Sequence, residues 1–266
     1  MGDGMTVRRV RDLDQHYDDL SDGDVVIGLL PGKYLRPELV ADLMDRGVRC
    51  VPSTLCQLLS RSKCAQAILL RHWMAPHTQV ITRRAKLMEA VGYCSRHRIA
   101  QVVTKQEGMH CGHGIRRWES AETLYNTVAF SASAYPFVLQ PFLPGLTDIR
   151  VIVVGDYVEA YVRENLYNFR ANLAVGGVSR PLAMDAAAER LCREVMRRGR
   201  FPYAHLDLQV TGDGRFWLSE IALDGGIAAA RIGREELRRR KQDILEQHAT
   251  ADGGSELKPH SIGRNP

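Results

Sequence analysis

Apolar residues recur along the chain with two different spacings, which divide it into short strands and amphipathic helices. Near the N-terminus, apolar runs at 24–30 and 48–52 predict strands, and the amphipathic segment between them at 37–46 predicts a helix. This order is typical of a small parallel α/β unit, shorter than a full nucleotide-binding domain. Residues 1–22 are polar and of mixed charge, and they predict a short helix or a loosely held arm.

The middle of the chain alternates between the same two patterns. Helices are predicted at 62–74, 83–98 and 119–132, and strands at 78–81, 101–105, 115–118 and 137–142. The sequence EGMHCGHG occupies positions 107–114, between the second and third of these strands. Its three glycines predict the tip of a hairpin.

The second half carries a stronger β pattern. Segments 148–154 and 157–163 flank Gly155 and Asp156, and segments 203–210 and 215–221 flank a Gly-Asp-Gly turn at 212–214. Both arrangements predict antiparallel hairpins. Helices are predicted at 185–198 and 233–248, and the polar, glycine-rich end from about 249 onward is expected to be disordered.

The composition is that of an ordinary globular chain, with 45% hydrophobic and 25% charged residues among 266. The longest apolar runs are too short to cross a bilayer, and the N-terminal segment lacks the apolar stretch of a secretory signal. We therefore expect a cytoplasmic protein with no membrane partner. Six cysteines without a CxxC pair predict reduced thiols.

The charge balance is mildly basic, with 36 Lys and Arg against 31 Asp and Glu, a net charge of +5. The basic runs at 193–200 and 234–241 lie within helical patterns, where a solvated face is the expected explanation. No aromatic-rich platform accompanies them, so nucleic acid is not an expected partner. The charge allows an acidic substrate or a carrier protein without requiring one.

Two carboxylates stand out on the last predicted hairpin. Asp207 lies in the middle of one strand, and Glu220 lies near the end of its partner. Buried carboxylates are costly unless they are paired or bind a cation, and oxygen ligands of this kind suit Mg²⁺. The sequence leaves two alternatives open: a magnesium site, or an ion pair between Asp207 and one of the many arginines.

Two further patterns suggest phosphate binding. Lys105 ends a predicted strand directly before the glycine-rich segment, and a lysine beside exposed backbone amides can hold phosphate. In FRANLAVGG, Arg170 and Asn172 alternate on an extended segment and could face one ligand together. Their guanidinium and amide suit an oxyanion and a metal or phosphate oxygen.

The order of these features resembles the ATP-grasp superfamily, and most closely its RimK-type carboxylate–amine ligases. The series comprises Lys63 before a helix, Lys105, the glycine-rich segment, LQPFL, DIR, FRAN, a glycine pair, and the Asp207 and Glu220 carboxylates. The resemblance covers roughly 59–246 and implies a mixed α+β and α/β chain with an ATP-grasp fold. It divides the chain into a shortened N-terminal α/β domain (1–58), a small lobe with the glycine-rich lid (59–136), a C-terminal lobe with the magnesium and phosphate site (137–248) and a disordered tail (249–266).

The resemblance also implies roles for individual positions. Those that match nucleotide-binding positions of the family are Lys63, Lys105, Gly108, Gly112, Gly114, Gln140, Phe142, Leu143 and Asp148. Arg170 matches the arginine that stabilises the transferred phosphate and the acyl-phosphate, with Asn172 beside it and Arg163 as an additional phosphate or substrate contact. Asp207 and Glu220 match the magnesium carboxylates.

Two departures from the family pattern concern the metal and the adenine. The family usually has Glu-x-Asn at the metal site, but here the third position is Ala222, so the missing oxygen would come from water, Asn172 or Asp224. Pro141 stands in the hinge where related sequences often have Glu, and proline removes one backbone donor. Adenine recognition would then rely on neighbouring groups such as the Leu143 N–H.

The activity implied is ATP-dependent ligation of a carboxylate and an amine through an acyl-phosphate, with Mg²⁺, or Mn²⁺ in its place. The expected partners are a small carboxylic acid or amino acid and an amine, either of which could be carrier-bound, and the chain could form a homo-oligomer. The alternative is a degenerate ATP-grasp protein that binds a nucleotide or a carrier without turnover. A third interpretation treats His110, Cys111 and His113 as a metal site.

Overall fold

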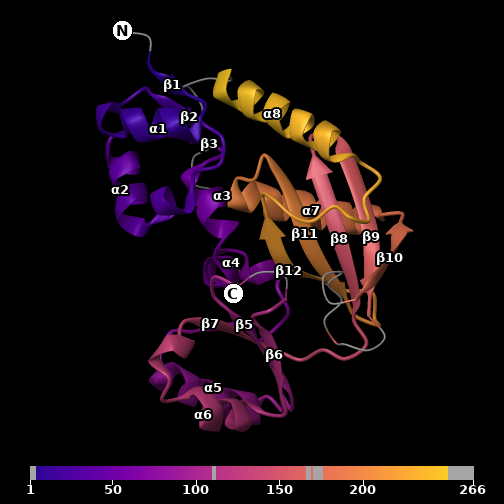
Figure 1. The fold of residues 1–266 in the computed structure, drawn as a ribbon. Coiled ribbons are helices and arrows are strands. Elements are labelled where there is room, and N and C mark those ends of the chain that lie inside the picture. The colour runs from indigo at the N-terminus through magenta and orange to yellow at the C-terminus, as the bar shows by residue number, and fades with distance from the viewer. Residues whose placement is uncertain (1–3, 110–111, 166–168, 170–175, 251–266) are drawn as a thin grey trace, which may run out of the picture. The chain divides into compact units, whose positions relative to one another are not determined.

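The computed structural model describes residues 4–109, 112–165, 169 and 176–250. The chain forms two compact units, one made of Met1–Thr54 with Arg238–Pro266 and the other of Leu55–Leu237 (Figure 1). Within the described residues, every helix is too short or too polar to cross a bilayer. The five described cysteines, at positions 50, 56, 64, 94 and 192, are buried and free of disulfides.

The first unit contains a three-stranded parallel sheet in the order β1-β2-β3. Its strands and helices are β1 (Thr6–Val7), α1 (Val10–His16), β2 (Val25–Ile27), α2 (Pro37–Asp45) and β3 (Arg49–Val51), with 3-10 turns at Tyr17–Asp19 and Gly32–Leu35. The predicted strand–helix–strand unit is therefore confirmed. Residues 1–22 supply the expected short helix and also β1, which the sequence did not reveal.

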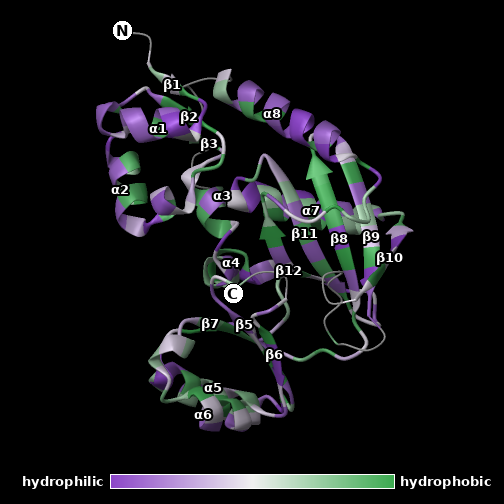
Figure 2. Ribbon diagram, in the orientation of Figure 1, coloured by the Kyte–Doolittle hydropathy of each residue, from purple (hydrophilic) through white to green (hydrophobic). Residues whose placement is uncertain are grey.

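The carboxylate of Asp24 explains how such a short strand is held. It accepts hydrogen bonds from the backbone N–H groups of Met5 (2.6 Å) and Ser21 (2.7 Å), which fixes β1 beside β2. Helix α8 (Arg234–Thr250) contributes its C-terminal part to this unit. Arg8 binds Glu246 (3.1 Å), and Arg49 donates to the carbonyl of His248 (3.1 Å). Helix α8 is largely hydrophilic (Figure 2) and runs to Thr250, two residues beyond its predicted end.

The second unit begins with two short helices and contains a four-stranded antiparallel sheet in the order β4-β7-β5-β6. Its elements are α3 (Thr54–Leu59), α4 (Lys63–Leu69), β4 (Gln79–Ile81), α5 (Arg84–Arg96), β5 (Val102–Gln106), β6 (Ile115–Trp118), α6 (Ala121–Val128) and β7 (Phe137–Pro141). Helices α5 and α6 lie side by side and enclose a core that includes Leu87, Leu124 and Phe137 (Figure 1). The predicted hairpin around the glycine-rich segment is confirmed.

Two helices of this region are shorter than predicted. Helix α4 starts where Ser62 caps it, with the Ser62 hydroxyl accepting a hydrogen bond from the Ala65 N–H (2.9 Å). It ends at Leu69 instead of Met74, because Arg71–Trp73 tightens into a 3-10 turn. Helix α6 ends at Val128, and the segment rich in Ser and Ala that follows forms a separate 3-10 turn at Ala132–Ala134.

The rest of the second unit is a five-stranded antiparallel sheet in the order β10-β9-β8-β11-β12. Its elements are β8 (Thr147–Val154), β9 (Tyr157–Glu164), β10 (Val178–Leu182), α7 (Ala186–Gly199), β11 (Tyr203–Val210) and β12 (Phe216–Ala222). Both predicted hairpins are confirmed. Alternate residues of the central strands, including Val151, Leu206 and Leu208, form a fully buried apolar face, and the abundance of apolar residues along β8 is visible in Figure 2. Helix α7 packs on β11 with its buried stripe of Cys192 and Val195.

Gln66 joins its helix, α4, to the end of α3 and to the five-stranded sheet. Its side-chain amide donates to the carbonyls of Leu59 (2.6 Å) and Ile221 (2.9 Å), and its oxygen accepts from the Ile221 N–H (3.1 Å). All three bonds are buried. The side chain therefore attaches α4 to the C-terminal end of β12, because it satisfies both backbone groups of Ile221.

We predict that Gln66→Leu lowers the free energy of unfolding by about 2–4 kcal/mol, because it leaves buried backbone groups of Leu59 and Ile221 without partners. Chemical denaturation of the full chain would measure this loss. Gln101→Leu is the matched control: it removes one exposed bond to Glu119 (3.0 Å) and should change stability by no more than about 0.5 kcal/mol. Equal effects of the two substitutions would contradict the role given to Gln66.

Candidate active site

The face of the five-stranded sheet opposite α7 carries polar side chains in register. Arg150 on β8, Asp207 on β11 and Glu220 on β12 are consecutive cross-strand partners in one row. In the next row, Arg163 on β9 pairs with Asp148 on β8. Because residues two apart on a strand share a face, both rows lie on the same side of the sheet.

Asp207 is held between two guanidinium groups. Arg150 binds it through two nitrogens: Nη2 lies 3.0 Å from Oδ2, and Nε contacts Oδ1. Arg163 Nη2 lies 3.1 Å from the same Oδ2 and 2.5 Å from Asp148 Oδ1. The side chains are well enclosed, with 6% exposure for Arg163 and 11% for Asp207. The alternative of an arginine pair for Asp207, left open by the sequence, is therefore observed.

This network separates the pKa values of its two aspartates. Burial acts to raise the pKa of Asp207, but the charges of Arg150 and Arg163 outweigh it and lower the pKa to about 2. For Asp148, burial prevails together with repulsion from Asp207 and raises the pKa to about 6, against the opposing effect of Arg163. Asp207 is thus the firmly ionised member of the pair.

Two lysines reach the same edge of the sheet from other elements. Lys105 on β5 donates through Nζ to the carbonyl (2.9 Å) and the hydroxyl (3.0 Å) of Ser219 on β12. Lys63, at the start of α4, places Nζ 3.6 Å from Glu220 Oε1 and contacts the Met109 carbonyl. Burial lowers the pKa of Lys105, the charge of Lys63 adds to the decrease, and Glu220 opposes it. The two lysines therefore meet at the end of the carboxylate row.

The glycine-rich segment between β5 and β6 closes near Lys63. Gly108 and Gly112 adopt left-handed backbone conformations (φ 71° and 79°), which glycine tolerates without strain. A Cβ on Gly114 would lie only 2.5 Å from the Met109 side chain, so these two residues approach closely. Glu107 accepts a hydrogen bond from the Cys64 N–H (3.0 Å) and so attaches the segment to α4.

The hinge residues at the end of β7 and just beyond it make different contacts. The Gln140 side chain is buried and donates to the Thr78 hydroxyl (2.9 Å), and the Phe142 N–H donates to the Gln101 carbonyl (2.9 Å). Leu143 follows outside the strand, and its N–H has no hydrogen-bond partner within residues 4–109, 112–165, 169 and 176–250. It is therefore a backbone donor that a ligand could use.

Arg117 on β6 adds a contact that sequence reasoning missed. Its guanidinium carbon lies 5.0 Å from the centre of the Phe142 ring and 5.6 Å from that of Phe169, and the two rings meet edge to face at 6.2 Å. An arginine within this distance of two rings makes favourable cation–π contacts with both. Alternation along 115–118 placed Arg117 on a strand, but no sequence signal paired it with aromatic residues so distant in the chain.

The segment after β12 folds back over the polar face. The Gly226 carbonyl accepts hydrogen bonds from Arg150 Nη1 (3.4 Å) and the Tyr161 hydroxyl (3.3 Å). The buried Glu159 carboxylate accepts from the N–H groups of Arg231 (2.7 Å) and Ile232 (3.3 Å). A Cβ on Gly225 would lie 2.6 Å from Arg150 Nη1, so this close approach requires glycine.

The remaining expected metal ligands differ in position. Ala222 pairs with His205 in the row next to Asp207 and Glu220, so its methyl group shares their face. Asp224 is exposed beyond the end of β12, where its charge adds to burial in raising the pKa of Tyr203. Within the described residues, no three His, Cys, Asp or Glu side chains gather closely enough to hold a metal ion.

Several candidate residues lie outside the described part of the chain, namely Arg170, Asn172, His110 and Cys111. The roles expected for Arg170 and Asn172 therefore stay predictions, as does the metal site at His110, Cys111 and His113. The structure brings together Lys63, Lys105, Asp207 and Glu220, with Asp148 and Arg163 beside them. Arg150 joins this set; it belongs to the DIR motif, but the sequence could not show which arginine would meet Asp207.

The model of the RimK-like ATP-grasp domain matches residues 60–227. The chain belongs to this family. The RimK-like match covers the four-stranded sheet, the five-stranded sheet and every described site residue from Lys63 to Asp224. It confirms the ATP-grasp fold and the assignment to a class of carbon–nitrogen ligases. No curated protein sequence matches the chain.

Solved ATP-grasp structures are similar to this RimK-like chain in fold. D-alanine–D-alanine ligase from Bacillus anthracis aligns with a TM-score of 0.62 at 14% identity, over 91% of this chain and 85% of the ligase. The D-cycloserine synthetase DcsG aligns with a TM-score of 0.60 at 16% identity, over 84% and 83%. The ATP-grasp ligase PsnB, in complex with a minimal precursor, Mg and ADP, aligns with a TM-score of 0.57 at 14% identity, over 86% and 79%.

We predict that Asp207→Asn lowers the free energy of unfolding at pH 7 by about 3–5 kcal/mol, because it leaves two buried guanidiniums short of a partner. The folded pKa of about 2 lies below the unfolded value of 3.8, so this contribution is complete above pH 4 and is lost as the pH falls toward 2. The difference in the free energy of unfolding between wild type and variant should therefore decrease by about 2 kcal/mol as the pH falls from 4 to 2.

Denaturant titrations between pH 7 and pH 2 would measure this narrowing. The control is Asp243→Asn, which removes an exposed i,i+4 pair with Arg239 (3.0 Å) and should have an effect within about 0.5 kcal/mol throughout. If the difference in the free energy of unfolding stayed constant with pH, the ion pairs of Asp207 with the arginines would not be what stabilises the fold.

Proposed function

We propose that this protein is an ATP-dependent carboxylate–amine ligase that forms an amide through an acyl-phosphate and releases ADP and phosphate. The observation that carries the proposal is the charge arrangement on the polar face. Four bases (Lys63, Lys105, Arg150 and Arg163) meet three acids (Asp148, Asp207 and Glu220) in a partly enclosed site. The excess of positive charge suits the phosphates of a nucleotide.

The chemistry follows from what such a site can supply. A substrate carboxylate oxygen attacks the γ-phosphorus of ATP, and the bond to the bridging oxygen breaks to release ADP. The amine nitrogen then attacks the acyl carbon, phosphate leaves with the bonding electron pair, and the nitrogen loses a proton. Both steps depend on positioning and charge neutralisation rather than on a protein nucleophile. Lys63 and Lys105 would bind the phosphates, and the glycine-rich segment would exclude water from the acyl-phosphate.

Magnesium fits this site as an ion that arrives with the nucleotide. Glu220 keeps 34% exposure, and its one ion pair within the described residues is a 3.6 Å contact with Lys63, so its oxygens are available to a cation. Mg²⁺ prefers one or two protein carboxylates together with phosphate oxygens and water, and Mn²⁺ accepts the same donors. When bound, the ion would neutralise phosphate charge. Asp207 would be the second ligand, and Asn172, Asp224 or water would replace the oxygen that Ala222 lacks.

The arginines and Asp148 would have supporting roles. Arg163 and Arg150 hold Asp207 and Asp148 from within the sheet, so we assign both arginines to positioning these carboxylates. Asp148 would have to share its bond to Arg163 in order to meet a ribose hydroxyl. Adenine would lie at the hinge, against Phe142 and with a hydrogen bond from the Leu143 N–H, which has no partner among the described residues. Arg170 would stabilise the transferred phosphate.

The substrates belong to broad chemical classes. A small carboxylic acid or amino acid and an amine fit the ligase class, and either could be attached to a peptide or carrier. The ATP-grasp ligase PsnB, which is similar in fold, forms a complex with a minimal precursor, Mg and ADP, and this supports including a carrier-bound substrate in the proposal. A homo-oligomer and a cytoplasmic location are compatible with this proposal.

A second candidate is an ATP-grasp protein that binds nucleotide without turnover. Two observations favour it: Ala222 removes the usual amide ligand, and Asp207 is already bound by two arginines. A screen for ADP release, with amino acids and small carboxylates in the presence of Mg²⁺, separates the candidates. The ligase releases ADP only with a productive pair of substrates, whereas the non-catalytic protein binds ATP and releases none.

We predict that Lys105→Met weakens the binding of a non-hydrolysable ATP analogue by about tenfold or more, because it removes a charge-assisted contact to phosphate. Isothermal titration calorimetry with Mg²⁺ would measure the affinity. Lys86→Met is the control, because Lys86 is exposed and pairs with Glu89 (2.7 Å) on α5. If the Lys105→Met protein is folded and binds the analogue with unchanged affinity, Lys105 does not contact the nucleotide.

We further predict that Arg170→Ala abolishes ADP release while ATP binding stays within about threefold of the wild type, because the arginine would act on the transferred phosphate. Single-turnover assays with the substrate pair found in the screen would measure this. Normal turnover in the variant would contradict the assignment of Arg170.

A further inference from the structure

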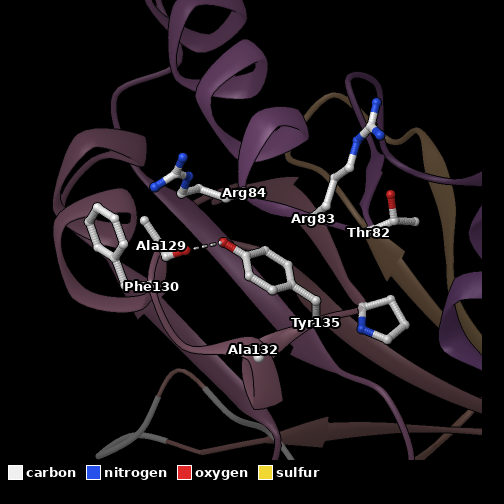
Figure 3. Close-up of a pocket in the computed structure, with 8 residues that line it drawn as sticks. Thr82, Arg83, Arg84, Ala129, Phe130, Ala132 and Tyr135 are labelled. Carbon is white, nitrogen blue, oxygen red and sulfur yellow. Dashed lines mark hydrogen bonds between the residues drawn. The ribbon is translucent and has the colours of Figure 1, made fainter.

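The four-stranded sheet carries a second charged feature, which the proposed ligase chemistry does not use. A shallow pocket of about 500 Å³ opens between the start of α5 and the segment that joins α6 to β7 (Figure 3). Its most distinctive side chains are those of Arg83, Arg84, Phe130 and Tyr135. Figure 3 shows the Tyr135 ring between the two arginines, with Phe130 on the side of Arg84.

The two arginines give the pocket a positive charge that the described residues do not neutralise. Neither Arg83 nor Arg84 forms a salt bridge within the described part of the chain. None of the side chains that line the pocket is acidic. Glu89, on the same helix, is bound to Lys86 at 2.7 Å, although the charge of Arg83 also acts on it. The guanidiniums are therefore available to an anionic ligand.

The basic residues at the start of α5 are unfavourable for the stability of that helix in the absence of a ligand. The N-terminus of a helix carries a partial positive charge and favours acidic residues. Here the cap residue is Arg83, the first turn contains Arg84 and Lys86, and it has no acidic residue. Basic residues at the N-terminus of a helix destabilise that helix, and such residues are expected where a function requires them. A carboxylate from a ligand would relieve the repulsion between these positive charges.

Aromatic rings supply the apolar part of the pocket. Phe130 is 81% exposed, and its ring centre lies 5.0 Å from the guanidinium carbon of Arg84. Tyr135 is fixed by a hydrogen bond from its hydroxyl to the Ala129 carbonyl (3.2 Å). An exposed phenylalanine beside two arginines that form no salt bridge with any described residue resembles the core of a protein interface, where aromatic and arginine residues contribute most of the binding energy.

We propose that this pocket binds an acidic segment of a protein partner, with carboxylates on Arg83 and Arg84 and an apolar side chain against Phe130. Charge complementarity argues for an anionic partner. A peptide is favoured over nucleic acid because Phe130 is the one exposed ring among the residues that line the pocket. Tyr135 stacks on Phe137, but Phe137 is buried and offers no surface to a base. The inference does not depend on ligase activity.

The test uses the full chain and a fluorescein-labelled peptide in which two glutamates stand on each side of one phenylalanine. Fluorescence anisotropy should detect binding of this peptide and binding at least about tenfold weaker for the version with glutamine in place of glutamate. The double variant Arg83→Gln/Arg84→Gln should weaken binding of the acidic peptide by about tenfold. Phe130→Ala should weaken it separately, and this loss should vanish for a peptide with alanine in place of phenylalanine.

The matched control is Arg96→Gln/Arg98→Gln, which removes the same charge from the other end of α5 and should leave binding unchanged. Circular dichroism melting would establish that each variant is folded. The proposal fails if the acidic and neutral peptides bind equally, if both double variants have the same effect, or if no binding occurs at millimolar peptide. It also fails if single-stranded oligonucleotides bind through Arg83 and Arg84 more tightly than the acidic peptide. None of these results bears on ADP release.

Discussion

The buried carboxylate of Asp207 is the interaction on which the site and its sheet both depend. Its charge is tolerable only because Arg150 and Arg163 reach it from two neighbouring strands. A slip of one residue between β8 and β11 would move one member of the pair to the apolar face beside α7. The ion pairs and the apolar face therefore specify the same register. The residues that build the polar row are also residues that fix the fold.

The site further depends on contacts between α4, β5 and β12. Gln66 attaches α4 to the backbone of Ile221. Lys63 lies on the same helix, so this attachment brings it close to Glu220. Lys105 reaches the adjacent Ser219 from β5. Two lysines on separate elements thus converge on neighbouring residues of one strand. Their repulsion is offset by Glu220 and by the Ser219 carbonyl, and phosphate would offset it further.

The sequence predicts the contacts of this site well where the partners are close in sequence, and poorly where they are far apart in sequence. The Gly-Asp-Gly turn predicted the hairpin that carries Asp207 and Glu220, because a short turn joins neighbouring antiparallel strands. The register of the turn alone would set Asp207 opposite Ser219. A register shift between Asp207 and Leu208, which the sequence did not reveal, brings Glu220 opposite Asp207. The arginine partners of Asp207 lie on strands that are distant in sequence, so spacing could not select them. Strand β10 was not predicted, because VSRPL is mostly exposed and contains proline, as an edge strand can. Helix α4 ends at Leu69, before its predicted end, because Arg71–Trp73 forms a 3-10 turn.

The two carboxylates of the central row are unequal in their readiness to bind a cation. Both Asp207 oxygens are occupied by guanidinium groups, and these groups lower the pKa of Asp207 to about 2, so a metal would have to compete with two permanent charges. In the part of the chain that the structure describes, Glu220 pairs with one lysine, Lys63, at 3.6 Å, and it keeps a third of its side chain exposed. A nucleotide that drew Lys63 toward its phosphates would free Glu220 at the same time. On this argument, under the proposed function, the phosphates and the metal would bind together, with Glu220 as the first protein ligand and Asp207 as the second.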